Sequence, residues 1–352
     1  GTSIAGGSGN DTFVVTGSNL QTSSTIAGGA GNDSVSFGGE LSGGLVDGGA
    51  SQDTLNFSAG VNNGASVLGD AGSDLLLFSS TISSASIGGG AGGDSMVFKG
   101  ALSSSTIDYG ADSDTLTLSV AATSTTILGG AGADTLVFTT GADLVTSSIS
   151  GGADADSLVF SVAVKSATSV AGGGGADTMV FNSSVGGAFI SLDSGADSVS
   201  FVTTVSGATM HGGGGTQTVV FSSIADTATF TGGFGGGFIS LGAGNDLITF
   251  SGAGVTGTTI NGSENSDTIH FVGGQNTVVF GSAIGTAAQV SFGAGNDMAT
   301  FSGAISAGSV YGGGGADTLN FSGAVTSGAT IDQGAGADSL HFGSTLTGTT
   351  LT

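Results

Sequence analysis

The chain has 352 residues, of which 72 are glycine, and it contains no proline and no cysteine. Its 26 acidic residues are opposed only by Lys99 and Lys165, so the net charge is −24. This balance excludes nucleic acid as a partner, because there is no basic patch that could neutralise phosphates. Hydrophobic residues make up 38% of the chain, which is enough to bury a core. No apolar run reaches the roughly 18 residues that a membrane-spanning helix needs.

An internal repeat runs along the whole chain, and each copy contains a glycine-rich turn that ends on an anchor residue. Two such turns are Gly28–Asp33 and Gly312–Asp317. Anchors recur every 20 to 22 residues, apart from two longer steps, and Gln217 replaces Asp in one copy. We predict that the aspartate anchors are metal ligands: Asp11, Asp33, Asp53, Asp74, Asp94, Asp114, Asp134, Asp156, Asp177, Asp197, Asp246, Asp267, Asp297, Asp317 and Asp338.

Three apolar columns accompany the anchors. An apolar residue lies two positions after each anchor and Phe usually two positions later, as with Val35 and Phe37, which is strand periodicity. A second column lies seven residues before each anchor, as with Ile26, and a third lies four residues after the Phe, as with Val61. Stacked coils would bury these columns. We therefore predict an all-β, right-handed parallel β-solenoid of about 16 coils of 20–22 residues.

Two steps between anchors are longer, with 29 residues from Gln217 to Asp246 and 30 from Asp267 to Asp297. We interpret each as an insertion of about nine residues, a loop that bulges out of one coil near 222–237 and near 272–288. The whole of 1–352 is then a single continuous domain. Phe230 and Phe234 fall outside the Phe column in the first insertion, where they serve either local packing or a partner contact.

Six turns fit the nine-residue pattern GGxGxDxUx completely, and they begin at Gly6, Gly28, Gly89, Gly129, Gly172 and Gly312. The pattern resembles the RTX (repeats-in-toxin) nonapeptide. The resemblance implies a β-roll that binds Ca²⁺ in its turns, type I secretion, and folding in extracellular calcium. It differs in one respect, because here only one edge of each coil has the acidic turn. We therefore expect a single file of calcium sites.

The spacing of the anchors supports a cation independently of any family. Carboxylates stacked at about 4.8 Å repel each other by about 0.9 kcal/mol per pair in water, and by about 3.5 kcal/mol at an effective dielectric constant of 20. The alternative is that each Asp only caps its turn through an Asx-type hydrogen bond. Gln217 and the glycine-poor turn before Asp267 predict weak or empty sites at those two positions.

Nothing in the sequence indicates catalysis. His211, His270 and His341 fall in different coils, and no nucleophile stands out with a matching base. We expect an extracellular or cell-surface, calcium-binding structural protein, the building block of a surface layer, sheath or filament. Its partners would be further copies, end to end or side by side, or a cell-surface polysaccharide. The alternatives are an adhesin stalk, an ice-binding face formed by the rows of Thr and Ser beside the Ile column, as at 125–127 and 258–260, and the RTX module of a larger secreted enzyme.

Overall fold

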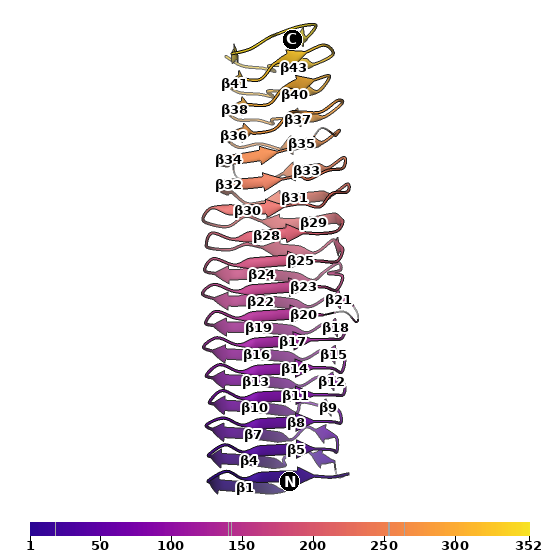
Figure 1. Cartoon of the computed structure of the whole chain (residues 1–352), viewed down its shortest axis with the longest axis vertical. Helices are drawn as coiled ribbons and strands as arrows, with labels where there is room; N and C mark the ends of the chain where they lie inside the picture. The colour runs from indigo at the N-terminus through magenta and orange to yellow at the C-terminus, as the bar shows by residue number, and fades with distance from the viewer. Residues whose placement is uncertain (18, 140, 142, 253, 264) are drawn as a thin grey trace. The chain divides into compact units, whose positions relative to one another are not determined.

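The computed structural model describes residues 1–352 except Ser18, Thr140, Ala142, Ala253 and Glu264. The chain forms two compact units, Gly1–Thr178 and Met179–Thr352. Each unit is a parallel β-solenoid (Figure 1), and the described residues contain no helix. The predicted all-β solenoid is thereby confirmed, with about 17 turns in the two units together.

Most coils of the first unit contribute three strands of different length. The long strands carry the second apolar column and run into the turn: β1 (Ser3–Ser8), β4 (Thr25–Ala30), β7 (Leu45–Ala50), β10 (Ser66–Ala71), β13 (Ser86–Ala91), β16 (Thr106–Ala111), β19 (Thr126–Ala131), β22 (Ser148–Ala153) and β24 (Ser169–Gly174). The four-residue strands follow the anchors: β2 (Thr12–Val15), β5 (Ser34–Phe37), β8 (Thr54–Phe57), β11 (Leu75–Phe78), β14 (Ser95–Phe98), β17 (Thr115–Leu118), β20 (Thr135–Phe138) and β23 (Ser157–Phe160). The two-residue strands carry the third column: β3 (Leu20–Gln21), β6 (Leu41–Ser42), β9 (Val61–Asn62), β12 (Ile82–Ser83), β15 (Leu102–Ser103), β18 (Ala122–Thr123) and β21 (Leu144–Val145).

All strand pairs in this unit are parallel and stay in the register of the repeat. Ile26 lies opposite Val46 in the long strands, and Val35 lies opposite Leu55 in the four-residue strands. Val61 lies opposite Leu41 in the short ones. These side chains are fully buried. The three predicted columns are therefore three continuous inward-facing ladders, as expected for stacked coils that cannot bury an apolar edge alone.

The Phe column forms a stack of rings inside the first unit. The rings of Phe57 and Phe78 are 5.2 Å apart with an interplanar angle of 8°, and those of Phe78 and Phe98 are 4.9 Å apart with an angle of 3°. Leu118 replaces Phe in one coil, and the stack resumes with Phe138. One inward ring per coil at this spacing supplies much of the apolar burial in a sequence that is rich in glycine.

The second unit follows the same plan with fewer short strands. One sheet contains β27 (Phe189–Ser191), β29 (Val205–His211), β31 (Thr227–Thr231), β33 (Leu247–Phe250), β35 (Thr268–Phe271), β37 (Gln289–Ser291), β40 (Ser309–Tyr311), β43 (Thr330–Asp332) and β45 (Thr350–Leu351). The opposing strands are β28 (Ser198–Phe201), β30 (Gln217–Val220), β32 (Phe234–Ser240), β34 (Val255–Asn261), β36 (Thr277–Phe280), β38 (Met298–Phe301), β41 (Thr318–Phe321) and β44 (Ser339–Phe342). The remaining strands are β25 (Thr178–Phe181), where the chain enters this unit, and β26 (Val185–Gly186), β39 (Ile305–Ser306) and β42 (Val325–Thr326).

The two predicted insertions are wrong. Residues 222–237 contain β31 and the start of β32, and residues 272–288 contain β36, all paired in register with neighbouring coils. Phe230 lies opposite Met210 in the preceding coil, 20 residues earlier, so the coil length does not change there. The extra nine residues are therefore part of the solenoid wall.

What changes at these places is the edge of the coil on which the anchor lies. Gln217 is followed after nine residues by Asp226, whose carboxylate accepts a hydrogen bond from the N–H of Val205, a third-column residue. Asp226 also begins its own copy of the repeat, with Ala228 two positions later and the buried Phe230 four positions later. The anchors thus move to the opposite edge for the turns at Asp226, Asp246 and Asp267. They return to the first edge at Asn276, again nine residues after an anchor.

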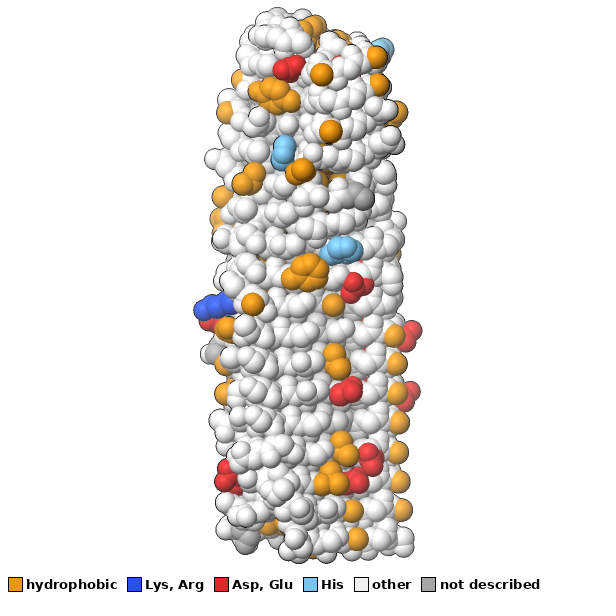
Figure 2. All heavy atoms as spheres, turned by 180° about the vertical axis from the view of Figure 1, so that it is seen from behind, with side chains coloured by type: hydrophobic (Ala, Val, Ile, Leu, Met, Phe, Trp, Pro, Cys, Tyr) orange, Lys and Arg blue, Asp and Glu red, His pale blue; other side chains and the backbone are white. Residues whose placement is uncertain are grey.

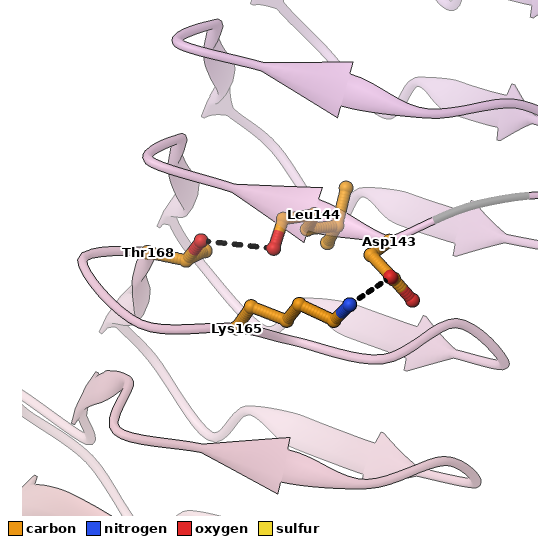
Figure 3. A network of polar contacts seen from close by, with 4 residues as sticks. All are labelled: Asp143, Leu144, Lys165 and Thr168. Carbon is orange, nitrogen blue, oxygen red and sulfur yellow. Dashed lines mark hydrogen bonds and ion pairs between the residues drawn. The ribbon is translucent and has the colours of Figure 1, made fainter.

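Ion pairing adds little to the solenoid. Lys165 forms a salt bridge with Asp143 on the neighbouring coil, beside the hydrogen bond from the Thr168 hydroxyl to the carbonyl oxygen of Leu144 (Figure 3). Both charged side chains are substantially exposed, so the pair contributes little to stability.

No segment within the described residues is a helix long and apolar enough to cross a membrane.

The ring stack predicts a position-specific effect on stability. Phe78→Ala is expected to lower the free energy of unfolding by about 3–5 kcal/mol, because it leaves a cavity between two stacked rings. Leu77→Ala in the same strand is the matched control, since Leu77 faces outward and is only partly buried. Urea denaturation of both variants in calcium buffer measures the difference. Equal losses in the two variants would contradict the assigned orientation of β11.

Candidate cation sites in the aspartate turns

The turn before each anchor depends on glycine at defined positions. In Gly28–Asp33, Gly29 has a φ of +112°, a conformation that side chains rarely adopt. A Cβ at Gly29 would also collide with the carbonyl oxygen of Gly7 in the preceding coil. This close approach of turn to turn brings the inward-pointing Asp33 into the interior, where only 2% of it is exposed.

One oxygen of each anchor carboxylate caps the turn of the preceding coil. The N–H of Asp33 donates to Oδ1 of Asp53 at 2.7 Å, and the N–H of Asp53 donates to Oδ1 of Asp74 at 2.7 Å. The same bond repeats along the first unit up to Asp156, whose N–H donates to Oδ1 of Asp177 at 2.8 Å. Oδ1 therefore does not make the predicted Asx-type cap of its own turn, because its hydrogen bond runs to the backbone of the preceding coil.

The other oxygen, Oδ2, is buried without a hydrogen-bond partner in eleven anchors. These are Asp11, Asp33, Asp53, Asp74, Asp94, Asp114, Asp134, Asp156, Asp246, Asp297 and Asp317. A buried carboxylate oxygen without a donor is costly unless a proton or a cation neutralises its charge. The inter-coil hydrogen bond therefore accounts for the burial of Oδ1 but not for that of Oδ2.

Carbonyl oxygens of the next coil converge on the same space as Oδ2. A Cβ built on Gly48 would lie 2.6 Å from Oδ2 of Asp53 and 2.9 Å from the carbonyl oxygen of Gly69. A Cβ on Gly69 would likewise lie 2.5 Å from Oδ2 of Asp74. The first glycine of the turn thus leaves room for two acceptor oxygens from adjacent coils, and no protein donor lies between them.

The raised pKa values of several anchor carboxyl groups show the electrostatic cost of this arrangement. Burial, together with the charges of neighbouring acids, raises the pKa of Asp94, Asp114 and Asp156 to about 7, although the N–H of the preceding anchor opposes the shift. Burial raises the pKa of Asp53 to about 6 by the same balance. At neutral pH these groups are held at the edge of protonation unless a cation neutralises them.

A hard divalent cation such as Ca²⁺ fits this set of donors. Ca²⁺ prefers carboxylate and backbone carbonyl oxygens and tolerates irregular coordination. Within the described residues, no three His, Cys, Asp or Glu side chains gather as a metal-holding group, so each site would combine one anchor with backbone carbonyls. The unpartnered Oδ2 and the converging carbonyls meet this requirement.

Sequence reasoning missed Asp226 as an anchor, and the structure separates it from the cation-type turns. Its Oδ2 accepts hydrogen bonds from the N–H of Ser222 at 3.0 Å and from the Ser222 hydroxyl at 2.9 Å. Oδ2 of Asp267 accepts the N–H of Ser263 at 3.2 Å, so this turn is also satisfied internally. The pattern Asp226-Thr-Ala-Thr-Phe230 was the signal that could have identified the missed anchor.

Tyr109 interrupts the pattern within the first unit. It occupies the position of Gly89 in the preceding coil, it is fully buried, and its hydroxyl has no partner. Burial and the nearby anchors raise its pKa well above the usual value. The same coil has Leu118 in place of Phe, so one large inward side chain replaces another. The space that glycine leaves open elsewhere is therefore occupied beside Asp114.

Among the residues that the structure describes, the other acidic side chains and the histidines do not gather into a second metal-holding group. Asp70 and Asp112 adopt positive φ values of 72° and 78° at turn positions where other coils have glycine or serine. Burial and the charge of Asp70 raise the pKa of Asp47 to about 6. The three histidines lie on separate strands or their ends, as expected.

Fold and turns together define a parallel β-solenoid with files of buried aspartates at its edges. No family model and no curated protein matches the chain. Among solved structures, it is similar to a hyperactive, Ca²⁺-dependent, β-helical antifreeze protein from an Antarctic bacterium, with 22% sequence identity. The match covers 74% of this chain and 83% of that chain, with a TM-score of 0.45.

The raised pKa values predict how pH affects the calcium-free protein. An unfolded Asp has a pKa near 4, whereas burial raises the pKa of Asp53 to about 6 and that of Asp94 to about 7, so the folded state holds more protons in this window. The free energy of unfolding in EGTA should therefore fall as pH rises from about 4 to about 7.

Urea denaturation at several pH values measures this dependence, and calcium titrations should release protons over the same range. A free energy of unfolding that is constant or rises between pH 4 and 7 in EGTA would contradict the burial of the anchors as described.

Proposed function

We propose that the chain is a calcium-stabilised structural solenoid that acts outside the cell, and that it has no catalytic role. The observation that carries the proposal is the file of buried Oδ2 atoms without donors, most of which lie beside a carbonyl oxygen of the next coil. Millimolar extracellular calcium would neutralise the file, whereas low intracellular calcium would leave its charges uncompensated.

The finer assignment is to RTX-type repeats, and it rests on the six complete nonapeptides. If the chain is exported in that manner, it would pass through a type I channel unfolded and fold on meeting calcium. The uncompensated anchors would keep the chain from folding prematurely, because neighbouring carboxylates repel each other at the strand spacing.

A structural role in a surface layer, sheath or filament is supported by the character of the surface. Fourteen aspartate anchors are buried, so most of the negative charge of the chain lies inside. The face shown in Figure 2 presents few charged groups and mainly small polar side chains and backbone. A surface with little charge favours side-by-side packing of copies, because little repulsion opposes it. We propose such self-association, with a cell-surface polysaccharide as a further partner.

Calcium removal tests the proposal directly. EGTA at pH 7.5 should weaken the β-sheet circular dichroism signal and lower the melting temperature by tens of degrees. Added Ca²⁺ should restore the signal, whereas an equal concentration of Mg²⁺ should not, because Mg²⁺ demands a compact octahedral site. Light scattering on the same samples should detect assembly only with Ca²⁺. Spectra and melting curves that are unchanged by EGTA would refute the calcium assignment.

Ice binding is the second candidate, and one row of hydroxyl groups favours it. The first residue of the four-residue strands faces outward and is Ser or Thr in consecutive coils, as at Ser95, Thr115 and Thr135. Parallel strands place these hydroxyls about 4.8 Å apart on a sheet surface. Leu75 interrupts the row.

Inhibition of ice recrystallisation measures this second candidate. If the row binds ice, the chain should inhibit recrystallisation in calcium buffer, and Thr115→Lys should reduce the effect severalfold. Thr106→Lys provides the matched control, because Thr106 is an exposed Thr of the same coil on the other sheet. Equal activity of the two variants, or none in the unmodified chain, would rule out this row as an ice-binding face.

A further inference from the structure

The turn that ends at Gln217 has a close counterpart 100 residues later. Gly212–Gln217 and Gly312–Asp317 both begin with four glycines and differ only in the last two residues. Their backbones form the same hydrogen bond to the preceding coil, from the N–H of Gly195 to the carbonyl oxygen of Gly214 at 2.9 Å, and from Gly295 to Gly314 at 2.8 Å. The two turns therefore isolate the effect of an amide in place of a carboxylate.

The amide oxygen of Gln217 takes over the capping role of the aspartates. Oε1 accepts the N–H of Asp197 at 2.9 Å, just as Oδ1 of Asp317 accepts the N–H of Asp297 at 2.8 Å. Gln217 is also as deeply buried as the aspartate anchors, at 1% exposure. The inter-coil cap is therefore preserved without a charge.

The amide nitrogen of Gln217 donates hydrogen bonds, which a carboxylate oxygen of aspartate cannot do. Nε2 donates to the carbonyl oxygens of Gly195 and Gly214, both at 3.1 Å, and so joins two successive turns. In the Asp317 turn the corresponding second atom is Oδ2, an acceptor without a donor. A donor thus replaces an anion that requires a cation.

We propose that the side-chain amide of Gln217 is a built-in substitute for an aspartate and its bound cation, so that this turn folds without calcium. The inference rests on the proposed calcium binding of the aspartate turns. The sequence predicts only that the cation site at Gln217 is weak or empty, whereas we infer that this turn needs no cation at all. The position needs no ion because its N–H groups already satisfy the turn carbonyls.

Three neighbouring turns are also satisfied from within, and with Gln217 we call them the crossover turns: those ending at Gln217, Asp226, Asp267 and Asn276. Both ends of the Asn276 amide are also paired, but differently: its Nδ2 donates to Oδ1 of Asp297 at 2.8 Å and to the carbonyl oxygen of Gly274 at 3.4 Å, and its Oδ1 accepts the N–H of Val255 at 2.9 Å. The hydroxyl of Ser222 donates to Oδ2 of Asp226, and the backbone N–H of Ser263 donates to Oδ2 of Asp267. Among the described anchors from Gln217 to Asn276, Asp246 alone retains an unpartnered Oδ2. The places where the anchors change edge are thus the calcium-independent part of the second unit.

Hydrogen exchange of the unmodified full chain gives the first test. In EGTA, amides around Gly212–Gln217 should keep their protection, whereas amides around Gly312–Asp317 should lose theirs by at least tenfold. Equal loss of protection in both turns would overturn the inference. No variant has to fold for this comparison.

Reciprocal substitutions give the second test, with bound calcium counted by elemental analysis after equilibrium dialysis. Gln217→Asp should bind one additional ion per chain and lose protection at its turn in EGTA. Asp317→Gln should bind one ion fewer and gain protection there. An unchanged ion count in Gln217→Asp, with its turn still protected in EGTA, would overturn the inference.

Failure of the proposed function would give a different result. The unmodified chain would then bind no calcium at all, and EGTA would change the protection of neither turn.

Discussion

The constraint on which the structure depends is a file of like charges buried at the spacing of β-strands. Parallel coils repeat every side chain at about 4.8 Å, so an inward aspartate in each coil necessarily faces another. This repetition stabilises the apolar ladders, because neighbouring side chains bury one another, whereas it destabilises the carboxylates, because like charges repel. The glycine-rich turns make compensation by a cation possible, because they allow carbonyl oxygens of one coil to approach the carboxylate of its neighbour. A cation can then be shared between coils.

Capping and cation binding are often weighed as alternatives for a turn aspartate, yet here one carboxylate has an oxygen free for each. Oδ1 of Asp53 fixes the turn of the preceding coil through the N–H of Asp33, and this bond holds Oδ2 in the interior. Loss of a bound cation would therefore affect the cap as well. Repulsion between the uncompensated carboxylates would displace the Oδ1 atoms that accept the capping hydrogen bonds. At the proposed calcium sites, stability and ion binding would therefore be coupled.

Most of the fold could be predicted from the sequence, because apolar periodicity, the Phe column and the anchor spacing all indicated the same register. The change of edge could not be predicted from spacing alone. Nine extra residues fit a bulging loop as well as a step of half a coil, and only the strand pairs of Phe230 distinguish the two. The anchor pattern at Asp226 was visible but lacked the glycines that drew attention elsewhere. What the amide of Gln217 does was beyond the sequence, since it depends on which carbonyls lie within reach of Nε2.

The inter-coil cap also has a direction. The N–H of Asp94 is satisfied by the carboxylate of Asp114, and that of Asp114 by the carboxylate of Asp134, so each coil of the first unit depends on the one that follows it in the chain. A coil added on the N-terminal side of a finished stack finds its acceptor already in place. A coil added on the C-terminal side must instead bring the acceptor with it. Growth of the solenoid is therefore directional, and the N-terminal end of each stack, which offers a free carboxylate acceptor, is the better template.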